Sequence, residues 1–436
     1  MKILIWTQYF WPEHFHINEV ATSLQEAGEE VTVLTGKPNY PGGEIFDGYR
    51  AFGMNKQTHV GIDILRLPLK PRGASKALDL ALNYLSFIAS GYLLGPLALR
   101  GRQFDVVLVY APSPLLQALP AIFFAWTRGI PLVVWVQDLW PEALISTGFV
   151  RNRFILEAIK RIVRYIYRRA DLLLIPSEAF RDSIERLGGD PNKIRFHPNS
   201  SKPVPIQKTL SHNTQQLVQS ARHQFSIVYA GNIGTVQALD TVVAAANLLK
   251  DQDDVRFYIV GNGTMAGAVA DEIYRLGLGN VEMPGFVSPD EIQAVYDSAS
   301  VLLLCMKDDE EIAQTIPNKL QVYMAAGKPI IVSGNGEPAR VLTQARAGLV
   351  ANAGDARALA EAVMNLRRLP SDQRATLGEN GLKWFSRHFE IGQRTQTLIA
   401  HLQRAVAERK RPPSYWARFV HARRRGTSSG RGDRTD

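Results

Sequence analysis

Short apolar runs alternate with segments of helical periodicity, first over residues 1–200 and again over residues 225–388. This β-α alternation is typical of parallel sheets covered by helices on both faces. We therefore predict an α/β protein with two Rossmann-like, doubly wound domains. The expected strands lie at residues 3–7, 31–34, 64–67, 106–110, 132–136, 172–175, 195–197, 227–229, 257–260, 281–283, 301–305 and 329–332.

The chain has 436 residues, which is more than one ordinary hydrophobic core accommodates. Residues 201–224 are polar with little periodicity, so we interpret them as an interdomain linker. We expect C-terminal helices over residues 389–418 and a basic, disordered tail over residues 419–436. In such folds ligands bind at the carboxyl ends of the strands, which predicts loops of the two domains facing a cleft.

Residues 308–337 have the pattern loop, helix, turn, strand. Thr315 is the expected hydroxyl cap, Pro317 the expected first helical residue and Gly327 the stop. Lys319 then lies in the first turn, where a cation opposes the helix dipole. A phosphate held between Lys319 and the free N–H groups of that turn would explain this position. The alternative is a solvated surface lysine.

Two glycine-rich turns follow strands of the second half and are candidate phosphate loops. The first turn contains Gly231, Asn232 and Gly234, and the second contains Gly261 and Gly263. Glycines let a backbone approach a pyrophosphate closely, although ordinary strand-to-helix turns use them too.

Polar residues follow the first-half strands and are candidate acceptor-side groups. Asp138 and Glu142 follow a buried strand, where a carboxylate is costly unless it is paired or used. They would orient or deprotonate an acceptor hydroxyl, or cap a helix beside Trp140. Glu13, His14 and His16 share one loop, for which acceptor contact or loop packing is expected. No further ligand lies at fixed spacing, so we expect no metal.

Charge and hydropathy indicate an anionic surface as a partner. The formal net charge is +9, with basic clusters over residues 160–169 and in the last residues. Residues 80–99 carry no charge, so they predict a helix lying on a bilayer, a core helix or a membrane span. The single Cys305 forms no intrachain disulfide and fits a reducing compartment. The arginine-rich tail lacks a recognised nucleic-acid-binding module.

The ordered landmarks of the second half resemble those of the retaining family-4 glycosyltransferases of the GT-B fold. They are the segments 229–234, 260–263, 284–287, 323–329 and 348–350. Three further segments resemble a narrower branch of O-antigen, capsule, colanic-acid and N-acetyl-L-fucosamine transferases. They are residues 38–41, among them Asn39, residues 138–142 and residues 317–319. The resemblance covers about residues 1–405 and implies a C-terminal helix that returns toward the first domain.

This resemblance also implies site residues, and the chain departs from the pattern. The family's paired glutamates fall on Gln314 and Val322, and its pyrophosphate-binding Arg and Lys fall on Asn232 and Gln237. Gln314 can still bind a sugar hydroxyl. The resemblance places the base against Phe286 and Val287 and the phosphates against Lys319 and the helix start. The helix-start and ribose candidates are Pro317, Asn318, Glu310, Glu311 and Glu337.

The implied activity is transfer of a sugar from a UDP-sugar, with a GDP-sugar as the alternative, to an undecaprenyl-diphosphate-linked saccharide. An N-acetylamino sugar is expected, transferred with retention and without a metal cofactor. The enzyme would lie on the inner face of a bacterial cytoplasmic membrane and bind no nucleic acid. A silent GT-B scaffold subunit is the non-enzymatic alternative, and an epimerase or phosphorylase of similar form is another enzymatic one.

Overall fold

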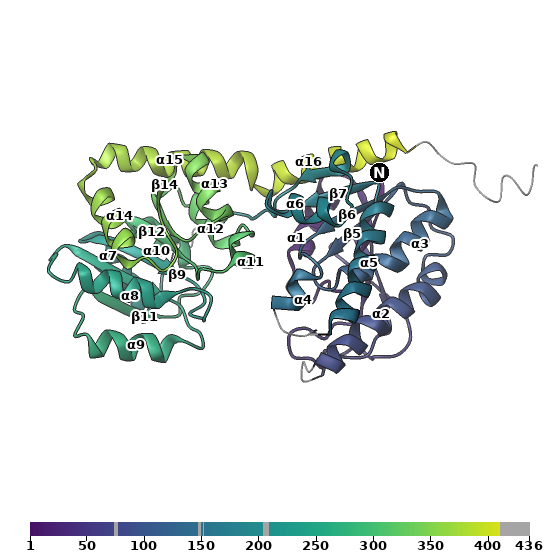
Figure 1. Cartoon of the computed structure of the whole chain (residues 1–436), viewed down its shortest axis with the longest axis horizontal. Coiled ribbons are helices and arrows are strands. Elements are labelled where there is room, and N and C mark those ends of the chain that lie inside the picture. Colours follow the sequence, from purple (N-terminus) through teal and green to yellow (C-terminus); the bar gives the residue numbers. More distant parts are fainter. Residues whose placement is uncertain (74–76, 147–149, 151, 204–208, 410–436) are drawn as a thin grey trace, which may run out of the picture. The chain divides into compact units, whose positions relative to one another are not determined.

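The structure is a computed structural model, and it describes residues 1–436 except 74–76, 147–149, 151, 204–208 and 410–436. The chain forms two compact α/β units (Figure 1). The expected tail, residues 419–436, lies outside the described residues. The first unit comprises Met1–Ile175, Arg181–Arg195 and the segment from Thr395, and the second comprises Pro176–Phe180 and Phe196–Arg394.

An eight-stranded sheet of order β3-β4-β2-β1-β5-β6-β7-β8 forms the first unit. β3 pairs with β4 in the antiparallel direction, whereas the strand pairs from β4 through β2, β1, β5 and β6 to β7 are parallel. The strands are β1 (Lys2–Trp6), β2 (Glu30–Gly36), β3 (Asn55–His59), β4 (Ile62–Leu67), β5 (Val106–Ala111), β6 (Leu132–Val136), β7 (Leu172–Ile175) and β8 (Ile194–Phe196). β3 was not predicted, because its sequence NKQTH is polar and its side chains are not buried.

Helices cover both faces of this sheet. α1 (His16–Glu26) and α16 (Ile391–Glu408) bury apolar residues on one face, in a core shared with β1, β2 and β5. α2 (Ala77–Ala98), α3 (Ala118–Arg128) and α5 (Arg153–Arg169) lie on the side to which Trp6 points. The expected return of a C-terminal helix to the first unit is confirmed by α16. Two further helices are α4 (Glu142–Ser146) and α6 (Phe180–Arg186).

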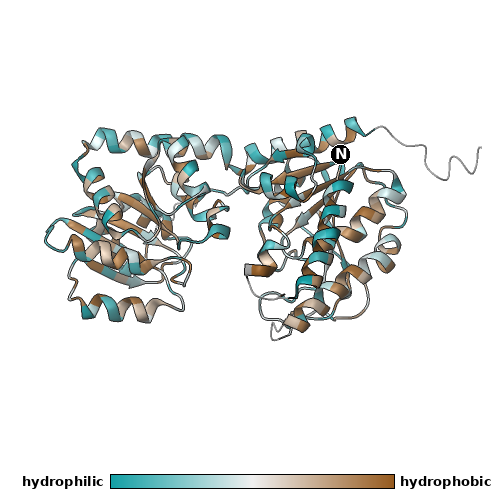
Figure 2. Ribbon diagram, viewed as in Figure 1, coloured by the Kyte–Doolittle hydropathy of each residue, from teal (hydrophilic) through white to brown (hydrophobic). Residues whose placement is uncertain are grey.

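The second unit contains a parallel six-stranded sheet of order β11-β10-β9-β12-β13-β14. Its strands are β9 (Phe225–Ala230), β10 (Val255–Val260), β11 (Val281–Gly285), β12 (Val301–Cys305), β13 (Ile330–Ser333) and β14 (Gly348–Ala351). Alternate residues of β9 enter opposite cores, with Ile227 and Tyr229 on one side and Val228 and Ala230 on the other. This confirms the predicted doubly wound sheet. Figure 2 shows the hydrophobic strands between helices of mixed hydropathy.

Helices form a layer on each side of the second sheet. One core contains apolar residues of α8 (Leu239–Leu248), α9 (Ala266–Arg275) and α14 (Ala356–Arg368). The opposite core contains residues of α7 (His212–Arg222), α10 (Ile292–Ser298), α12 (Asn318–Ala325), α13 (Glu337–Ala345) and α15 (Ser371–His388).

Two of these helices differ from the sequence-based expectation. Residues 201–224 were expected to be irregular, but α7 occupies half of that range. α7 buries Leu217, Val218 and Ala221 in the core that it shares with α10, α12, α13 and α15, and Ser211 caps its first turn. α15 was not predicted because its apolar positions are sparse, and two of its buried residues are Gly378 and Gly381.

Candidate functional site

A cavity of about 490 Å³ lies at the carboxyl ends of β9, β10 and β11 in the second unit. Its floor consists of the loops after β9 and β10, including Gly231, Asn232, Gly261 and Asn262. Its apolar wall consists of Phe286, Val287, Pro289, Ile292 and Tyr296. Phe286 is 66% exposed although it is a large apolar residue, so its ring is available to a planar ligand. The cavity therefore combines a polar backbone floor with an apolar wall.

The floor requires glycine because its two loops are in direct contact. A Cβ atom on Gly261 would lie 1.9 Å from the Gly231 carbonyl oxygen, and one on Gly263 would lie 2.2 Å from the Ile233 oxygen. The Gly231 N–H donates to Val260 at 2.9 Å, and the Ile233 N–H donates to Asn262 at 2.8 Å. The N–H groups of Asn232 and Asn262 donate to no residue in the described part of the chain. These two N–H groups are candidate donors to an anion.

Lys319 lies against this floor. Its Nζ atom is 3.8 Å from the centroid of the Tyr229 ring, and a Cβ atom on Gly231 would meet it at 2.7 Å. No described carboxylate forms an ion pair with Lys319. Burial lowers the pKa of this ammonium group to about 8. Lys319 is partly buried, and such a cation without a carboxylate partner is costly, so the geometry favours an anionic ligand here over a solvated lysine.

The helix that carries Lys319 begins later than predicted. Pro317 is the residue before the first turn of α12, Asn318 is the first helical residue, and no side chain caps the helix. Thr315 was expected to be the cap, but its hydroxyl donates to the Ile312 carbonyl at 2.9 Å. It therefore terminates the preceding short helix, α11 (Glu310–Ala313). The uncapped first turn of α12 leaves backbone donors available beside Lys319.

Two tyrosines that the sequence analysis missed hold the end of β9. The hydroxyl of Tyr323, on α12, accepts from the Ala230 N–H at 2.9 Å and donates to the Ala230 oxygen at 3.2 Å. The Tyr229 hydroxyl donates to the Asn232 carbonyl oxygen. Tyr323 thus joins α12 directly to the strand that precedes the floor. Apolar periodicity identifies Tyr323 as a core residue but does not reveal this hydrogen bond.

The positions where the resembled family has pyrophosphate-binding cations have a structural role here. The Gln237 side-chain oxygen accepts from the Gly234 N–H at 3.0 Å and closes the turn before α8. The Asn232 side-chain amide lies 3.5 Å from the same oxygen.

The ribose candidates lie on the loops after β12 and β13. Glu310 and Glu311 form the first turn of α11, whose N-cap is Asp309. The Gln314 side-chain oxygen is buried and has no partner among the described residues. Glu337 begins α13, is 5% exposed and forms two hydrogen bonds with Arg340, at 2.6 and 2.8 Å. Of these carboxylates, Glu337 is therefore the one with a fixed position.

In the first unit, Asp138 is held at the carboxyl ends of β5 and β6. Its Oδ2 atom accepts from the backbone N–H and the hydroxyl of Ser113, each at 2.8 Å. The Trp140 indole donates to the same hydroxyl at 3.0 Å. Asp138 therefore connects two strand ends, which the sequence did not indicate because Ser113 lies 25 residues away. Glu142 begins α4, and its Oε2 atom is buried without a partner among the described residues.

Glu13 fixes the loop that contains Asn39. Its Oε1 atom accepts from the N–H groups of Asn39 and Tyr40, each at 2.8 Å, and its Oε2 accepts from Phe10 at 3.3 Å. Burial raises the pKa of Glu13 to about 7 despite these three donors. The Asn39 side chain in turn accepts from the Arg72 N–H at 3.1 Å. Glu13 and Asn39 thus belong to one loop network.

The two histidines of this loop have different environments. His14 is exposed, whereas the His16 ring stands edge-on to Trp135 at 6.0 Å between ring centroids. Burial lowers the pKa of His16 to about 4, so its imidazole is neutral at physiological pH. Within the described residues, no group of three or more metal-binding side chains occurs.

An aromatic cluster beside Glu13 was not foreseen. Tyr9 stacks on Phe15 at 4.9 Å, and Tyr40 leans against both rings. The Arg72 guanidinium lies over Tyr9 and Tyr40 and donates to the Tyr9 hydroxyl at 2.9 Å. These residues are separated in sequence, so no local motif identifies them. Tyr9 is buried, whereas Tyr40 is 37% exposed, so Tyr40 is the tyrosine of this cluster whose ring a sugar can contact.

The apolar segment at residues 80–99 belongs to α2. This is the one described helix long and apolar enough to cross a membrane by length and composition. Its inner face is packed in the unit, because Cβ atoms on Gly91 and Gly95 would meet Pro120 and Trp6 at 2.8 and 2.9 Å. Its outer face exposes Leu78, Leu82, Leu85, Tyr92, Leu93 and Leu97. In this structure α2 is thus a domain helix with an exposed apolar face.

Comparison with known proteins identifies the class. Residues 14–200 match the Glycosyl transferase 4-like domain, and residues 224–368 match Glycosyl transferases group 1. Anabaena Alr3699/HepE, solved in complex with UDP, superposes with a TM-score of 0.66 at 15% identity and covers 93% of this chain and 100% of that one. Sucrose-phosphate synthase from Thermosynechococcus elongatus gives 0.63 at 16% identity, with 93% and 100% covered. The fold and these matches define a glycosyltransferase of the GT-B class.

More particularly, the chain joins a glycosyl transferase 4-like domain to a glycosyl transferases group 1 domain. It is similar to the putative colanic acid biosynthesis glycosyl transferase WcaI of Escherichia coli (strain K12), at 24% identity over 76% of this chain and 83% of that protein. It is also similar to the amylovoran biosynthesis glycosyltransferase AmsK of Erwinia amylovora, at 25% identity over 51% of this chain and 54% of that protein.

Proposed function

We propose that this glycosyltransferase transfers a sugar from a UDP-sugar to a lipid-linked saccharide during exopolysaccharide biosynthesis, with retention of anomeric configuration. The similarity to proteins named for colanic acid and amylovoran biosynthesis supports the pathway class. The HepE structures in complex with UDP and with UDP-glucose support the uridine nucleotide. An N-acetylamino sugar as the transferred group and an undecaprenyl-diphosphate carrier follow from the resemblance alone.

The observation that carries this proposal is Lys319 against Gly231. A leaving nucleoside diphosphate gains negative charge as the glycosidic bond breaks, and a preorganised cation stabilises that charge. Lys319 supplies the cation without a competing carboxylate among the described residues. The N–H groups of Asn232 and Asn262 and the uncapped start of α12 supply neutral donors. Lys319 would thus replace the charge absent at Asn232 and Gln237.

In the cavity of the second unit, the apolar wall is proposed to contact the uracil base, and the loops after β9 and β10 are proposed to bind the phosphates. Phe286 and Val287 follow β11, and a planar base fits against them. Glu337, held by Arg340, is the proposed acceptor for a ribose hydroxyl. In the first unit, Asp138 and the exposed ring of Tyr40 are proposed to bind the acceptor saccharide.

Two helices of the first unit support a position on the inner face of the cytoplasmic membrane. The outer face of α2 is apolar, and α5 carries Lys160, Arg161, Arg164, Arg168 and Arg169. Apolar side chains that enter the interface, beside cations that bind anionic lipid, form a peripheral membrane site.

The deciding experiment is calorimetric titration of the whole protein with UDP, GDP and ADP. We expect selective UDP binding that Lys319→Met weakens about tenfold to hundredfold, because a charged hydrogen bond contributes roughly 1.5–3 kcal/mol. Lys250→Met is the matched control, since Lys250 is exposed in the turn that follows α8 in the same unit. Preferential GDP binding would change the donor but retain the enzyme.

The titration also tests the non-enzymatic alternative. A silent scaffold subunit is suggested by the uncharged residues at Asn232, Gln237, Gln314 and Val322. If no nucleotide binds and Lys319→Met changes nothing, the transferase proposal fails and the scaffold interpretation replaces it. Turnover with a UDP-sugar and a lipid-linked acceptor would exclude the scaffold interpretation.

A further inference from the structure

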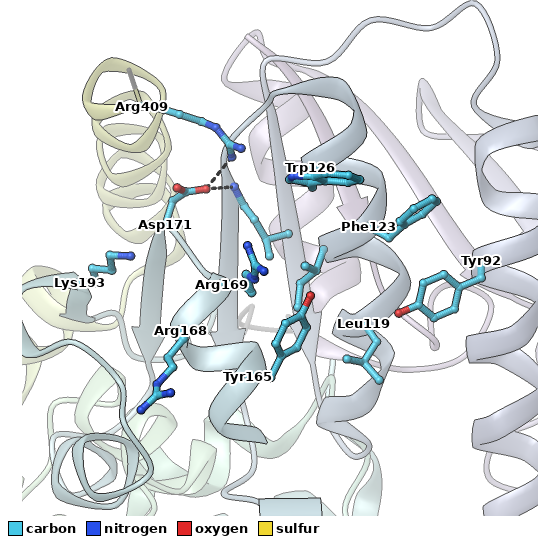
Figure 3. Close-up of a pocket in the computed structure, with 13 residues that line it drawn as sticks. Tyr92, Leu119, Phe123, Trp126, Tyr165, Arg168, Arg169, Asp171, Lys193 and Arg409 are labelled. Carbon is cyan, nitrogen blue, oxygen red and sulfur yellow. Dashed lines mark hydrogen bonds and ion pairs between the residues drawn. The ribbon is translucent and has the colours of Figure 1, made fainter. Parts of the chain in front are cut away.

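A second large cavity lies in the first unit, away from the loops described above. Its volume is about 510 Å³, and α2, α3, α5 and the ends of several strands surround it (Figure 3). Residues that line it include Tyr92, Phe123, Trp126, Tyr165, Arg168, Arg169, Asp171, Lys193 and Arg409.

This cavity lies at the edge of the sheet where its strands begin. Leu132 is the first residue of β6, Asp171 directly precedes β7, and Lys193 directly precedes β8. Asp138 and Ser113 follow the carboxyl ends of β6 and β5, which lie at the opposite edge of a parallel sheet. The cavity is therefore distinct from the proposed acceptor side.

One side of the cavity is cationic. Arg168, Arg169, Lys193 and Arg409 line it together with a single carboxylate, Asp171. Asp171 is already engaged, because it accepts from Arg409 at 2.8 Å and from the Leu132 N–H at 2.8 Å. Neither Arg168 nor Arg169 forms an ion pair with any described residue, and Arg169 lies over the Tyr165 ring at 5.3 Å. The cavity thus has an excess of positive charge.

The other side of the cavity is aromatic and continues onto α2, the helix with the exposed apolar face. Tyr92 and Phe123 lie 5.8 Å apart between ring centroids, and Phe123 lies 6.4 Å from Trp126 (Figure 3). Trp126 is 61% exposed. Tyr92 is adjacent in sequence to Leu93, which is 77% exposed on the outer face of α2. Tyrosine and tryptophan are the residues that favour the boundary between headgroups and acyl chains.

We propose that this cavity binds the phosphate headgroup of an anionic phospholipid, with the Arg169 guanidinium on the phosphate, the positive charge of Arg168 nearby and the aromatic side chains at the start of the acyl chains. Free phosphate would use the cations but not the aromatic wall. The chain's own segment after Arg409 is basic, so it has the same charge as the cavity. The inference rests on the proposed membrane association, which it extends from general attraction to one specific lipid site.

The test uses soluble lipids, so that it does not depend on membrane docking. The whole protein is titrated with dihexanoylphosphatidylglycerol below its micellar concentration, with dihexanoylphosphatidylcholine and with inorganic phosphate. We expect the phosphatidylglycerol to bind and both others to bind about tenfold more weakly or not at all. Equal binding of inorganic phosphate would overturn the proposal in favour of a plain anion site.

Paired variants assign the binding to the cavity. R168Q/R169Q should weaken phosphatidylglycerol binding about tenfold, whereas R50Q/R100Q removes two exposed charges of the same unit that lie outside the cavity and should not. Trp126→Ala should weaken it as well, whereas Phe154→Ala removes an exposed aromatic residue outside the cavity and should not. Equal effects of each variant and its control would overturn the proposal.

Vesicle sedimentation separates this inference from the proposed function. If the short-chain lipid fails to bind but anionic vesicles still retain the protein, the cavity inference is wrong and peripheral docking stands. Unchanged UDP titration and thermal unfolding in R168Q/R169Q would show that the unit remains folded and the donor site intact.

Discussion

The ammonium nitrogen of Lys319 lies 3.8 Å from the centre of the Tyr229 ring. The negative face of an aromatic ring stabilises a cation by about 0.5–2 kcal/mol, which only partly offsets the cost of burial. The pKa of Lys319 is therefore lowered, to about 8, and its charge lies against the backbone at Gly231. This cation is better stabilised with an anion bound than without one.

The first prediction concerns the pH dependence of nucleotide binding. Without bound nucleotide, Lys319 loses its proton as pH rises through its pKa of about 8. A diphosphate binds more tightly to the protein in which Lys319 is charged. UDP affinity should therefore fall as pH rises from about 7 to about 9.5, with proton uptake on binding above about pH 8. Calorimetry in buffers of different ionisation enthalpy measures that uptake. Lys319→Met should show none; if it does, the protonated group is not Lys319.

Gly231→Ala should damage the donor site. Its Cβ would lie 2.7 Å from the Lys319 ammonium group, and the φ of +145° at Gly231 is unfavourable for alanine. We expect UDP binding to weaken strongly and the stability of the second unit to fall by about 1–3 kcal/mol. The matched change Gly267→Ala, in α9 with no atom within 4 Å, should instead stabilise by roughly 0.5–1 kcal/mol. Normal UDP affinity in Gly231→Ala would argue against the proposed donor site.

Tyr323→Phe tests the connection between α12 and β9. The change leaves the buried Ala230 N–H without its acceptor, which costs about 1–3 kcal/mol. Denaturant unfolding should show this loss, and amide exchange at Ala230 should become faster. Tyr274→Phe, on the exposed surface of α9, is the control. Equal stability of the two variants would show that the hydroxyl does not hold the strand end.

Glu13 should make stability depend on pH in a defined direction. The pKa of Glu13 is about 7 in the folded protein and 4.5 for an unperturbed glutamate, as in the unfolded chain. Between these two pH values the native chain therefore binds more protons than the unfolded chain. The free energy of unfolding of the first unit should therefore fall as pH rises through this window. Glu13→Gln mimics the protonated form and should flatten the dependence, measured by hydrogen exchange at Asn39 and Tyr40. Glu26→Gln, at an exposed position of α1, should leave it unchanged.

Sequence periodicity predicted much of the fold because most strands are fully buried. Runs such as 106–110 and 301–305 have no polar positions, so parallel strands covered on both faces were readily identified. β3, α7 and α15 were missed for the opposite reason. β3 is a polar edge strand, and α7 buries one narrow stripe of a mostly polar helix.

The candidate site was only partly predictable. The glycine turns and Lys319 were identified because turn chemistry and the helix dipole are local properties of the sequence. The start of α12 was misplaced because Thr315 caps the end of α11 instead. Contacts between distant segments, such as Tyr323 with Ala230 or Asp138 with Ser113, have no local pattern, since they depend on which strands are neighbours.

The last described helix has a consequence for biosynthesis. Leu398, Ile399 and Leu402 of α16 complete a core with Ile3 and Val33, near the opposite end of the chain. The ribosome delivers these residues after residues 196–394, so most of the second unit is already available when α16 is made. The amino-terminal unit should therefore be the later of the two to mature. Until α16 arrives, the nascent chain exposes an apolar sheet surface, which is a natural substrate for chaperones.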